Sequence, residues 1–282
     1  MKPVTREDLP RVLDCLEKDL PRCLYLYADI WVYGLDNPHM KVWFQEDGEG
    51  VRKVAMEYHS SFQLWGDRDF GDTGDFLELI RSRAPRGISA RREIVEALAP
   101  DLPDFTAEYG FVVEHRLPPA ARLEARLAES GGAVCQAGEE DALEIAALIC
   151  ADPELGAQYT VEGLAAQLRE RMATGMGRSF IIRREGRIAA HTATFAECPK
   201  FVVAGGLVVR PDCRDTPYFL WLDQAVSLAA VREGKARYGM VQDPRLLRAF
   251  QRAGDRVAAE YGKLIKKPRE EAPGLQEKQG KR

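Results

Sequence analysis

The sequence contains no run of apolar residues long enough to span a bilayer. Its first nine residues include Arg6, Glu7 and Asp8 and have no apolar stretch of the signal-peptide type. The formal net charge is only -4, so there is no basic excess that would attract nucleic acid. We therefore expect a cytoplasmic protein that binds neither membranes nor nucleic acid.

Clustered metal ligands are also missing from the sequence. Its six cysteines form no C-x-x-C pair, and its four histidines are scattered along the chain. Because a zinc site needs clustered ligands, we expect no bound metal. Cys15 and Cys150 lie among apolar helical residues, where a reduced thiol acts as a small hydrophobic group.

The length of the chain predicts two domains. It has 282 residues, and a single hydrophobic core rarely serves so many. One Pro-Pro pair, at 118–119, precedes a short charged helical pattern, and one Gly-Gly pair, at 131–132, follows it. Such a segment is typical of a connector between domains. The expected division is a first domain over 1–117, a connector over 118–132, a second domain over 133–266 and a disordered tail over 267–282.

The first domain begins with a helix start signal. Thr5 and Asp8 have the spacing of a capping box, so we expect a helix from Thr5 onward. A strand-rich stretch follows, and Ser89 is the expected N-cap of a later helix. The remaining expected elements are strands over 41–45 and 51–64, helices over 76–83 and 91–98, and a closing strand over 106–117.

The second domain has a more regular order of elements. The stretch 201–209 has hardly a polar residue, so both faces of this strand are expected to be buried. Thr160 is expected to cap a helix. The expected strands are 133–136, 178–184, 187–196, 201–209, 236–242 and 256–265, and the other helices are 139–150, 216–232 and 244–253. This order predicts an α/β protein whose mixed sheet carries helices on both faces.

A short motif follows the buried strand. Val209, Pro211 and Arg214 have the spacing V-x-P-x-x-R directly before a helix. With the element order of residues 133–265, this motif resembles the GCN5-related N-acetyltransferase (GNAT) family. The resemblance implies the acyl-CoA N-acyltransferase fold, acetyl-CoA or another acyl-CoA as co-substrate, and a small-molecule or protein amine as acceptor. The first domain has a similar element order without the motif, so it looks like the degenerate first half of a tandem member.

The loop that enters a helix N-terminus points several backbone N–H groups at one spot, where the helix dipole adds positive potential. A pyrophosphate therefore binds well at such a loop. The resemblance implies that the strand aligns the pantetheine and that the loop holds the pyrophosphate of coenzyme A. The implied cofactor-binding residues are Leu207, Val208, Val209, Arg214, Asp215, Thr216, Tyr218, Phe219 and Asp243.

Three residues depart from the family pattern. Pro217 has no N–H to donate, and Phe219 places a ring where the family has a small residue. With Thr216 as N-cap, Pro217 would occupy the first helical position, where its missing N–H costs the helix no hydrogen bond. Phe250 stands where many members have a tyrosine that protonates the leaving thiolate. The alternative groups that could protonate the thiolate are a water, Cys213 and Tyr261.

Acyl transfer to an amine also needs a base. Glu197 is the nearest suitable carboxylate, and a solvated acid at the end of a strand is the alternative interpretation. His191 lies on the same strand and fits a core or surface histidine. Gly205-Gly206 predicts either a bulge that splays the neighbouring strands or a plain irregularity of the sheet.

Two functions are compatible with these residues. The first is an N-acyltransferase that moves an acetyl or other acyl group from coenzyme A to an amine, with Glu197 or a water as base. The alternative is a catalytically inactive member that serves as an acyl-CoA sensor or interaction module, which Pro217, Phe219 and Phe250 favour.

Overall fold

The structure is a computed structural model and describes residues 1–153, 155–156 and 159–267. The predicted disordered tail lies outside these residues, apart from Lys267. Among the described residues, strands form one twelve-stranded sheet. The strands are β1 (Lys2–Pro3), β2 (Met40–Asp47), β3 (Gly50–Tyr58), β4 (Ser61–Gly66), β5 (Gly87–Arg91), β6 (Phe105–Glu114), β7 (Val134–Gln136), β8 (Ser179–Arg184), β9 (Arg187–Glu197), β10 (Phe201–Val209), β11 (Ala236–Val241) and β12 (Arg256–Lys266).

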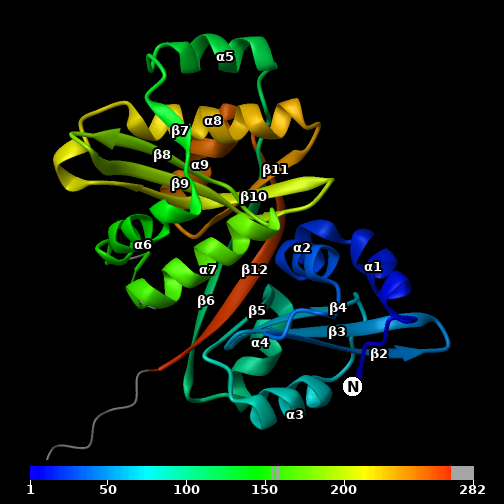
Figure 1. Cartoon of the computed structure of the whole chain (residues 1–282). Coiled ribbons are helices and arrows are strands. Elements are labelled where there is room, and N and C mark those ends of the chain that lie inside the picture. Colours follow the sequence, from blue (N-terminus) through cyan, green and yellow to red (C-terminus); the bar gives the residue numbers. More distant parts are fainter. Residues whose placement is uncertain (154, 157–158, 268–282) are drawn as a thin grey trace, which may run out of the picture.

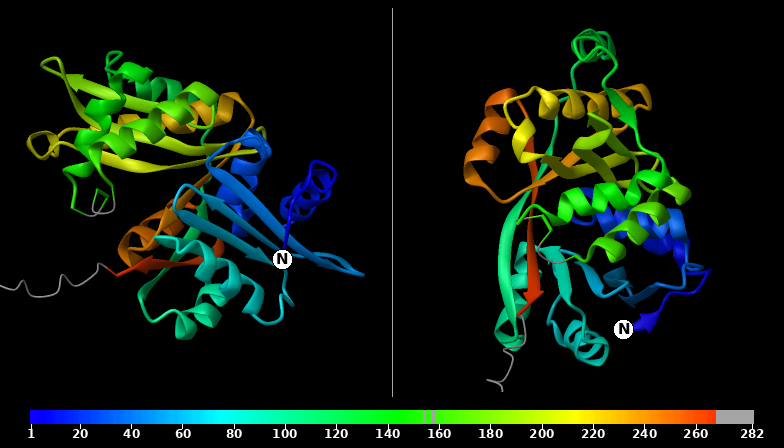
Figure 2. Two further views of the ribbon diagram at one scale, coloured as in Figure 1. Left: turned by 60° about the horizontal axis from the view of Figure 1, so that its bottom comes forward. Right: turned by 60° about the vertical axis from the view of Figure 1, so that its left-hand side comes forward.

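The strand order reads alike from both edges of the sheet. It is β1-β2-β3-β4-β5-β12-β6-β11-β10-β9-β8-β7. From each edge, five strands run inward in chain order and end in a parallel pair, β4 with β5 or β10 with β11. The remaining strand of each half crosses over: β6 pairs with β11, and β12 pairs with β5. The two halves therefore exchange their last strands, which lie side by side at the centre of the molecule (Figures 1 and 2).

Helices cover both faces of this sheet, as the sequence predicts (Figure 1). Helix α8 packs on one face of β8, β9 and β10, and α6 and α7 pack on the other face. Helices α1 and α2 share a core with residues of β10 and β11, so this core joins the two halves. The helices are α1 (Leu9–Glu17), α2 (Leu24–Tyr33), α3 (Gly74–Arg83), α4 (Arg92–Leu98), α5 (Ala120–Ala128), α6 (Ala142–Cys150), α7 (Val161–Thr174), α8 (Tyr218–Arg232) and α9 (Pro244–Ala253).

Three predictions in the first half need correction. The segment Leu24–Tyr33 is helix α2, within a stretch that was expected to be rich in strands. Ser89 lies inside β5 and does not cap α4, which begins after Arg91. The α-helical part of the first helix starts at Leu9, because the predicted Thr5–Asp8 capping bonds close a turn just before it.

The other observations concern membranes, metals and thiols. Within the described ranges, none of the helices is at once long and apolar enough to cross a membrane. In the same part of the chain, no group of three or more histidine, cysteine, aspartate or glutamate side chains is arranged to hold a metal ion. All six cysteines are free thiols.

Candidate functional site

Strands β10 and β11 part before either strand ends. Their last parallel pair joins Ala204 and Gly239, although β10 continues to Val209 and β11 to Val241. Past this pair, β10 stays with β9 while β11 stays with β6. The sheet therefore opens into a V, and backbone N–H and C=O groups along its inner edges can bond to a ligand.

A bulge in β10 marks the start of the opening, which confirms the bulge predicted from the two glycines. The register between β9 and β10 shifts between Gly205 and Val208, and Gly206 has a φ of +63°. Two side chains of β9 bond to the bulge carbonyls. The hydroxyl of Thr192 donates to the Gly205 carbonyl, and the ring of His191 bonds to the Gly206 carbonyl, each at 3.1 Å. The bulge is thus held by side chains and is a built feature of the sheet.

The role of His191 follows from its two ring contacts. Because a carbonyl can only accept, Nδ1 carries the proton and donates to Gly206. Nε2 lies 3.2 Å from the hydroxyl of Ser179 and accepts from it. Burial lowers the pKa of His191 to about 4, so the ring is neutral. His191 is therefore a satisfied core histidine that holds the bulge.

Replacing Gly206 with alanine is expected to lower the free energy of unfolding by about 3 kcal/mol. An alanine at positive φ costs about 1 kcal/mol, and its Cβ would lie 2.5 Å from the Phe195 ring, adding about 2 kcal/mol of overpacking. Gly186→Ala is the matched control, since Gly186 has a φ of +76° and no atom within 4 Å. Urea unfolding measures both changes, and equal losses would show that Phe195 does not brace the bulge.

Helix α8 starts at the same end of β10 and lacks a side-chain cap. It begins at Tyr218 with Pro217 as N-cap residue, so the predicted start at Thr216 is wrong. The physical reason is that the Thr216 hydroxyl donates to the Cys213 carbonyl at 2.6 Å, back into the 3-10 turn before the helix. The first N–H groups of α8 are thus left for water or a ligand.

Two other helices of this half, α7 and α9, have side-chain caps, whereas α6 lacks one as α8 does. Thr160 caps α7, as predicted, by accepting from the N–H of Gly163 at 3.2 Å. Asp243 caps α9 by accepting from the N–H of Arg245 at 2.7 Å. Asp243, one of the implied cofactor-binding residues, is therefore engaged with its own helix.

Charged side chains line the loop between β10 and α8. Arg210 bonds Asp212 through two contacts of 2.6 and 2.8 Å, so these two charges neutralise each other. The next two charged residues, Arg214 and Asp215, are exposed. A cavity of about 240 Å³ lies beside this loop, between α6 and the end of β10, and Arg214 forms part of its wall.

The remaining implied residues lie at the same end of β10. Leu207 is exposed in the bulge, Val208 is buried against α6 and α7, and Val209 packs on the side of α8. Tyr218 packs against Trp221, with ring centroids 5.8 Å apart. The prediction that both faces of this strand are buried therefore fails past Ala204, because the bulge turns Leu207 to the surface.

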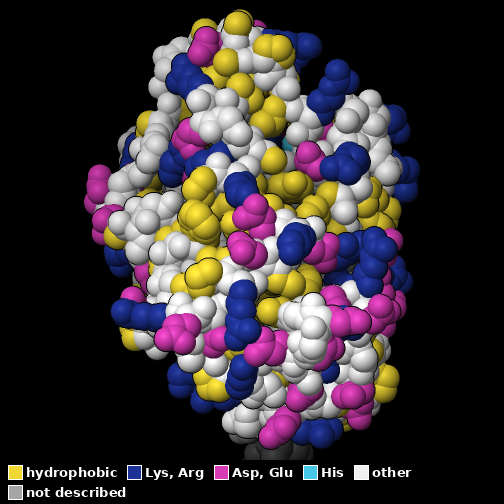
Figure 3. All heavy atoms as spheres, turned by 90° about the vertical axis from the view of Figure 1, so that its right-hand side faces the viewer, with side chains coloured by type: hydrophobic (Ala, Val, Ile, Leu, Met, Phe, Trp, Pro, Cys, Tyr) yellow, Lys and Arg dark blue, Asp and Glu magenta, His cyan; other side chains and the backbone are white. Residues whose placement is uncertain are grey.

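Four large apolar side chains on β10, α8 and α9 are exposed. Leu207 lies on β10, Phe219 and Leu220 lie on the first turn of α8, and Leu246 lies on α9. Helix α9 buries none of its residues fully. The face drawn in Figure 3 is hollowed in its upper part, and a histidine side chain lies in this hollow.

Comparisons with known proteins give matches only at the level of structure. No model of a known protein family matches the sequence, and no curated protein matches it. A GCN5-related N-acetyltransferase-like protein from Streptococcus suis is 13% identical with a TM-score of 0.59, over 92% of this chain and 98% of that chain. A GCN5-related N-acetyltransferase from Sphaerobacter thermophilus is 16% identical with a TM-score of 0.56, over 96% of both chains.

A tandem GNAT protein from the clavulanic acid biosynthesis pathway also matches. It is 13% identical with a TM-score of 0.57, over 95% of this chain and 99% of that chain. The fold of this chain is that of the GNAT proteins. The predicted acyl-CoA N-acyltransferase fold is thereby confirmed, and the tandem match agrees with the two similar halves of the sheet.

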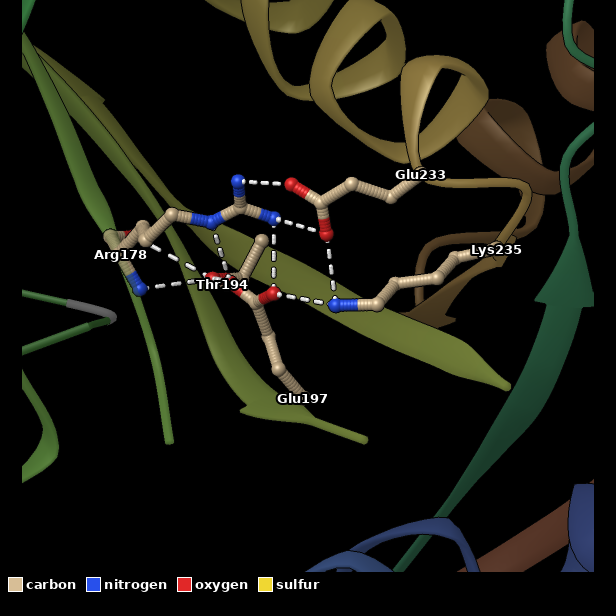
Figure 4. Close-up of polar contacts among 5 residues, drawn as sticks. All are labelled: Arg178, Thr194, Glu197, Glu233 and Lys235. Carbon is tan, nitrogen blue, oxygen red and sulfur yellow. Dashed lines mark hydrogen bonds and ion pairs between the residues drawn. The ribbon is translucent and has the colours of Figure 1, made fainter. Parts of the chain in front are cut away.

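In this GNAT fold, Glu197 lies at the far end of β10 from the loop that precedes α8. It is opposite Val202 and is 5% exposed. Arg178 donates to both of its oxygens, at 2.8 and 2.7 Å, and Lys235 lies 3.2 Å from one of them (Figure 4). Thr194 donates to the same carboxylate. Both oxygens of this buried carboxylate are occupied by bonds to Arg178, Lys235 and Thr194, so this geometry favours a structural role over that of a base.

A second ionisable pair lies nearer the V and was not found from the sequence. His115 follows β6, Asp255 precedes β12, and their side chains meet at 2.9 Å. Phe250 of α9 packs against the His115 ring with its edge, with ring centroids 4.9 Å apart. Of the predicted alternatives to a tyrosine at position 250, Cys213 is buried, and burial raises the pKa of Tyr261 to about 12.

Proposed function

We propose that this protein transfers an acyl group from a coenzyme A thioester to an amine. The observation that carries the proposal is the opening between β10 and β11 beside the uncapped start of α8. Strand edges suit the amide groups of a pantetheine arm, and helix N–H groups with the positive end of a helix dipole suit a pyrophosphate. Both features meet at one end of β10 in a GNAT fold.

We assign the binding site of the acyl-CoA donor to the residues at this end of the sheet. The backbone of β10 past the bulge aligns the pantetheine, and the exposed Arg214 adds positive charge beside the first turn of α8. The exposed leucines at 207, 220 and 246 cover the apolar parts of the arm. The proposed donor site consists of Leu207, Val208, Val209, Arg214, Asp215, Thr216, Tyr218 and Phe219, with Asp243 at its rim.

The reaction needs one bond to form and one to break. The neutral amine nitrogen attacks the thioester carbonyl carbon, the C–N bond forms and the C–S bond breaks. The amine loses one proton and the thiolate gains one. In this proposal, strand N–H groups beside the bulge donate to the carbonyl oxygen as it becomes negative, and one such donor accelerates acyl transfer by about 100-fold or more.

The side chain of Phe219 is the main obstacle to binding of the acyl-CoA at the start of α8. Asp223 and Ser227 lie four and eight residues after it on α8, so all three share one face of the helix. Both of these residues bond to Arg237 of β11, which places this face toward β11 and the opening. The Phe219 ring is thus on the side from which the pyrophosphate approaches.

Replacing Phe219 with glycine is expected to tighten acetyl-CoA binding by about tenfold, because phosphate oxygens can then approach the helix N–H groups. Leu143→Gly is the matched control. Leu143 is the second residue of α6, as Phe219 is of α8, and both side chains are 50% exposed. Calorimetry measures both variants. An unchanged dissociation constant for Phe219→Gly would place the pyrophosphate elsewhere.

The proposed function itself is tested by two measurements on the full chain. Calorimetry with acetyl-CoA is expected to give a micromolar dissociation constant, and release of free thiol is expected with at least one member of a panel of amines. No binding at millimolar acetyl-CoA would exclude the proposed function. Binding without turnover on the whole panel would instead indicate a sensor of acyl-CoA.

A further inference from the structure

We propose that His115 is the acid–base catalyst of this acyl transfer and that Asp255 positions its ring. The proposal rests on the proposed function, because it assigns the proton transfers of that reaction. It concerns two residues that lie 140 positions apart and meet at the centre of the sheet.

The His115–Asp255 pair has the geometry of an oriented base. Nδ1 of His115 lies 2.9 Å from one oxygen of Asp255, and the N–H of Arg116 donates to the other oxygen at 2.9 Å. Both carboxylate oxygens are thereby fixed. The side chains are 10% and 8% exposed, so the pair is shielded from most of the solvent. Among the described residues, Nε2 of His115 has no hydrogen-bond partner.

The free nitrogen lies at the vertex of the V. A Cβ on Gly239 would be 2.8 Å from Nε2 of His115, so the ring lies directly over this glycine. Gly239 and Ala204 are the last residues that join β10 to β11. Phe250 lines the other side of the ring and can neither give nor take a proton. Nε2 of His115 therefore lies beside the point where β10 and β11 part, and there a thioester held between the two strands would react.

Burial, more than the surrounding charges, favours the neutral form of the His115 ring. Burial lowers the pKa of His115, and Arg237 on β11 lowers it further. Asp255 at the start of β12 and Asp223 on α8 act in the opposite direction. The side chain that faces the ring from α9 is Phe250, which is apolar. A neutral ring that donates from Nδ1 to a carboxylate has its lone pair on Nε2, as a general base needs.

One imidazole can perform both proton transfers. Nε2 accepts the proton that the amine nitrogen loses as the C–N bond forms. The resulting imidazolium, stabilised by Asp255, then donates this proton to the sulfur as the C–S bond breaks. The proton balance closes without another reactant, and the ring returns to its starting state.

The exchange of strands explains why the pair exists. His115 follows β6 of the first half, and Asp255 precedes β12 of the second half. These two strands are neighbours only because each has crossed over, with Arg256 paired to Glu114. The first half would thus supply the catalyst for the cofactor site of the second half.

Two variants test the proposal kinetically. His115→Asn retains a donor to Asp255 and removes Nε2, so kcat is expected to fall about 100-fold while the acetyl-CoA dissociation constant changes little. For the unmodified chain, kcat/KM is expected to fall with decreasing pH below 6.5, as the lowered pKa of His115 requires. Asp255→Asn is expected to move this acid limb to lower pH, which a merely structural role would not do. Unchanged kcat and pH profiles would overturn the proposal.

A chemical measurement separates this proposal from the proposed function. Diethyl pyrocarbonate modifies free imidazole nitrogens, and mass spectrometry follows each histidine. Coenzyme A is expected to slow modification of His115 about tenfold and to leave the exposed His39 unaffected. If coenzyme A binds and His115 reacts at its original rate, the proposal fails and the proposed function stands. If coenzyme A does not bind, both fail.

Discussion

Replacing Glu197 with glutamine is expected to lower the free energy of unfolding by about 3 kcal/mol and to leave kcat of the folded protein within about twofold. The carboxylate is 5% exposed and bonds Arg178 through two contacts, with Lys235 at 3.2 Å. The amide keeps the shape of the side chain but removes its charge. Two largely buried cations are then left with Glu233, whose side chain is more exposed, as the carboxylate that they share, and this is more costly than losing a surface ion pair.

Glu233→Gln is the matched control for this prediction. Glu233 pairs with the same two cations, but its side chain is 36% exposed (Figure 4). Its loss is expected to cost about 1 kcal/mol or less, because solvent screens the remaining charges. Urea unfolding and the thiol-release rate are measured for both variants. A Glu197→Gln protein with unchanged stability and strongly reduced kcat would restore Glu197 as the base.

The elements of the second half could be predicted because their signals are local. Helix α9 has the predicted bounds, with Asp243 before its first residue and Gly254 after its last residue. Gly205-Gly206 gives the bulge, because only a glycine easily adopts the positive φ of residue 206. Helix α2 was missed because aromatic and β-branched residues of Leu24–Tyr33 favour strands, and burial of most of its residues decides for a helix.

The parts that could not be predicted depend on distant pairings. Glu197 is a carboxylate and could therefore be a base. Only the structure shows that it forms ion pairs with Arg178 and Lys235. In the sequence, His115 and Asp255 are ordinary polar residues beside two strands. They meet because β6 and β12 cross over and pair with each other. Strand order is set by pairing between segments far apart in the chain, and a hydrophobic pattern does not specify it.

Neither half of the chain is expected to fold alone, because each fragment lacks a strand that its own sheet needs. Fragment 1–131 contains β5 without β12, and fragment 132–282 contains β11 without β6. The core that α1 and α2 form with Phe201 and Tyr238 is also divided between the fragments. Each isolated fragment is expected to show no cooperative urea transition, whereas the two mixed at micromolar concentration are expected to form a one-to-one complex.

A nick in the connector gives the matched control. Gly131 and Gly132 both have positive φ and no atom within 4 Å of their Cβ positions, so a protease site is tolerated between them. Cleavage after folding is expected to leave the halves together in gel filtration, since β12 and β6 remain paired from Arg256 with Glu114 to Lys266 with Phe105. A cooperative transition in either isolated fragment would show that the halves are independent domains. Separation of the nicked halves without denaturant would show that the exchanged strands do not hold them together.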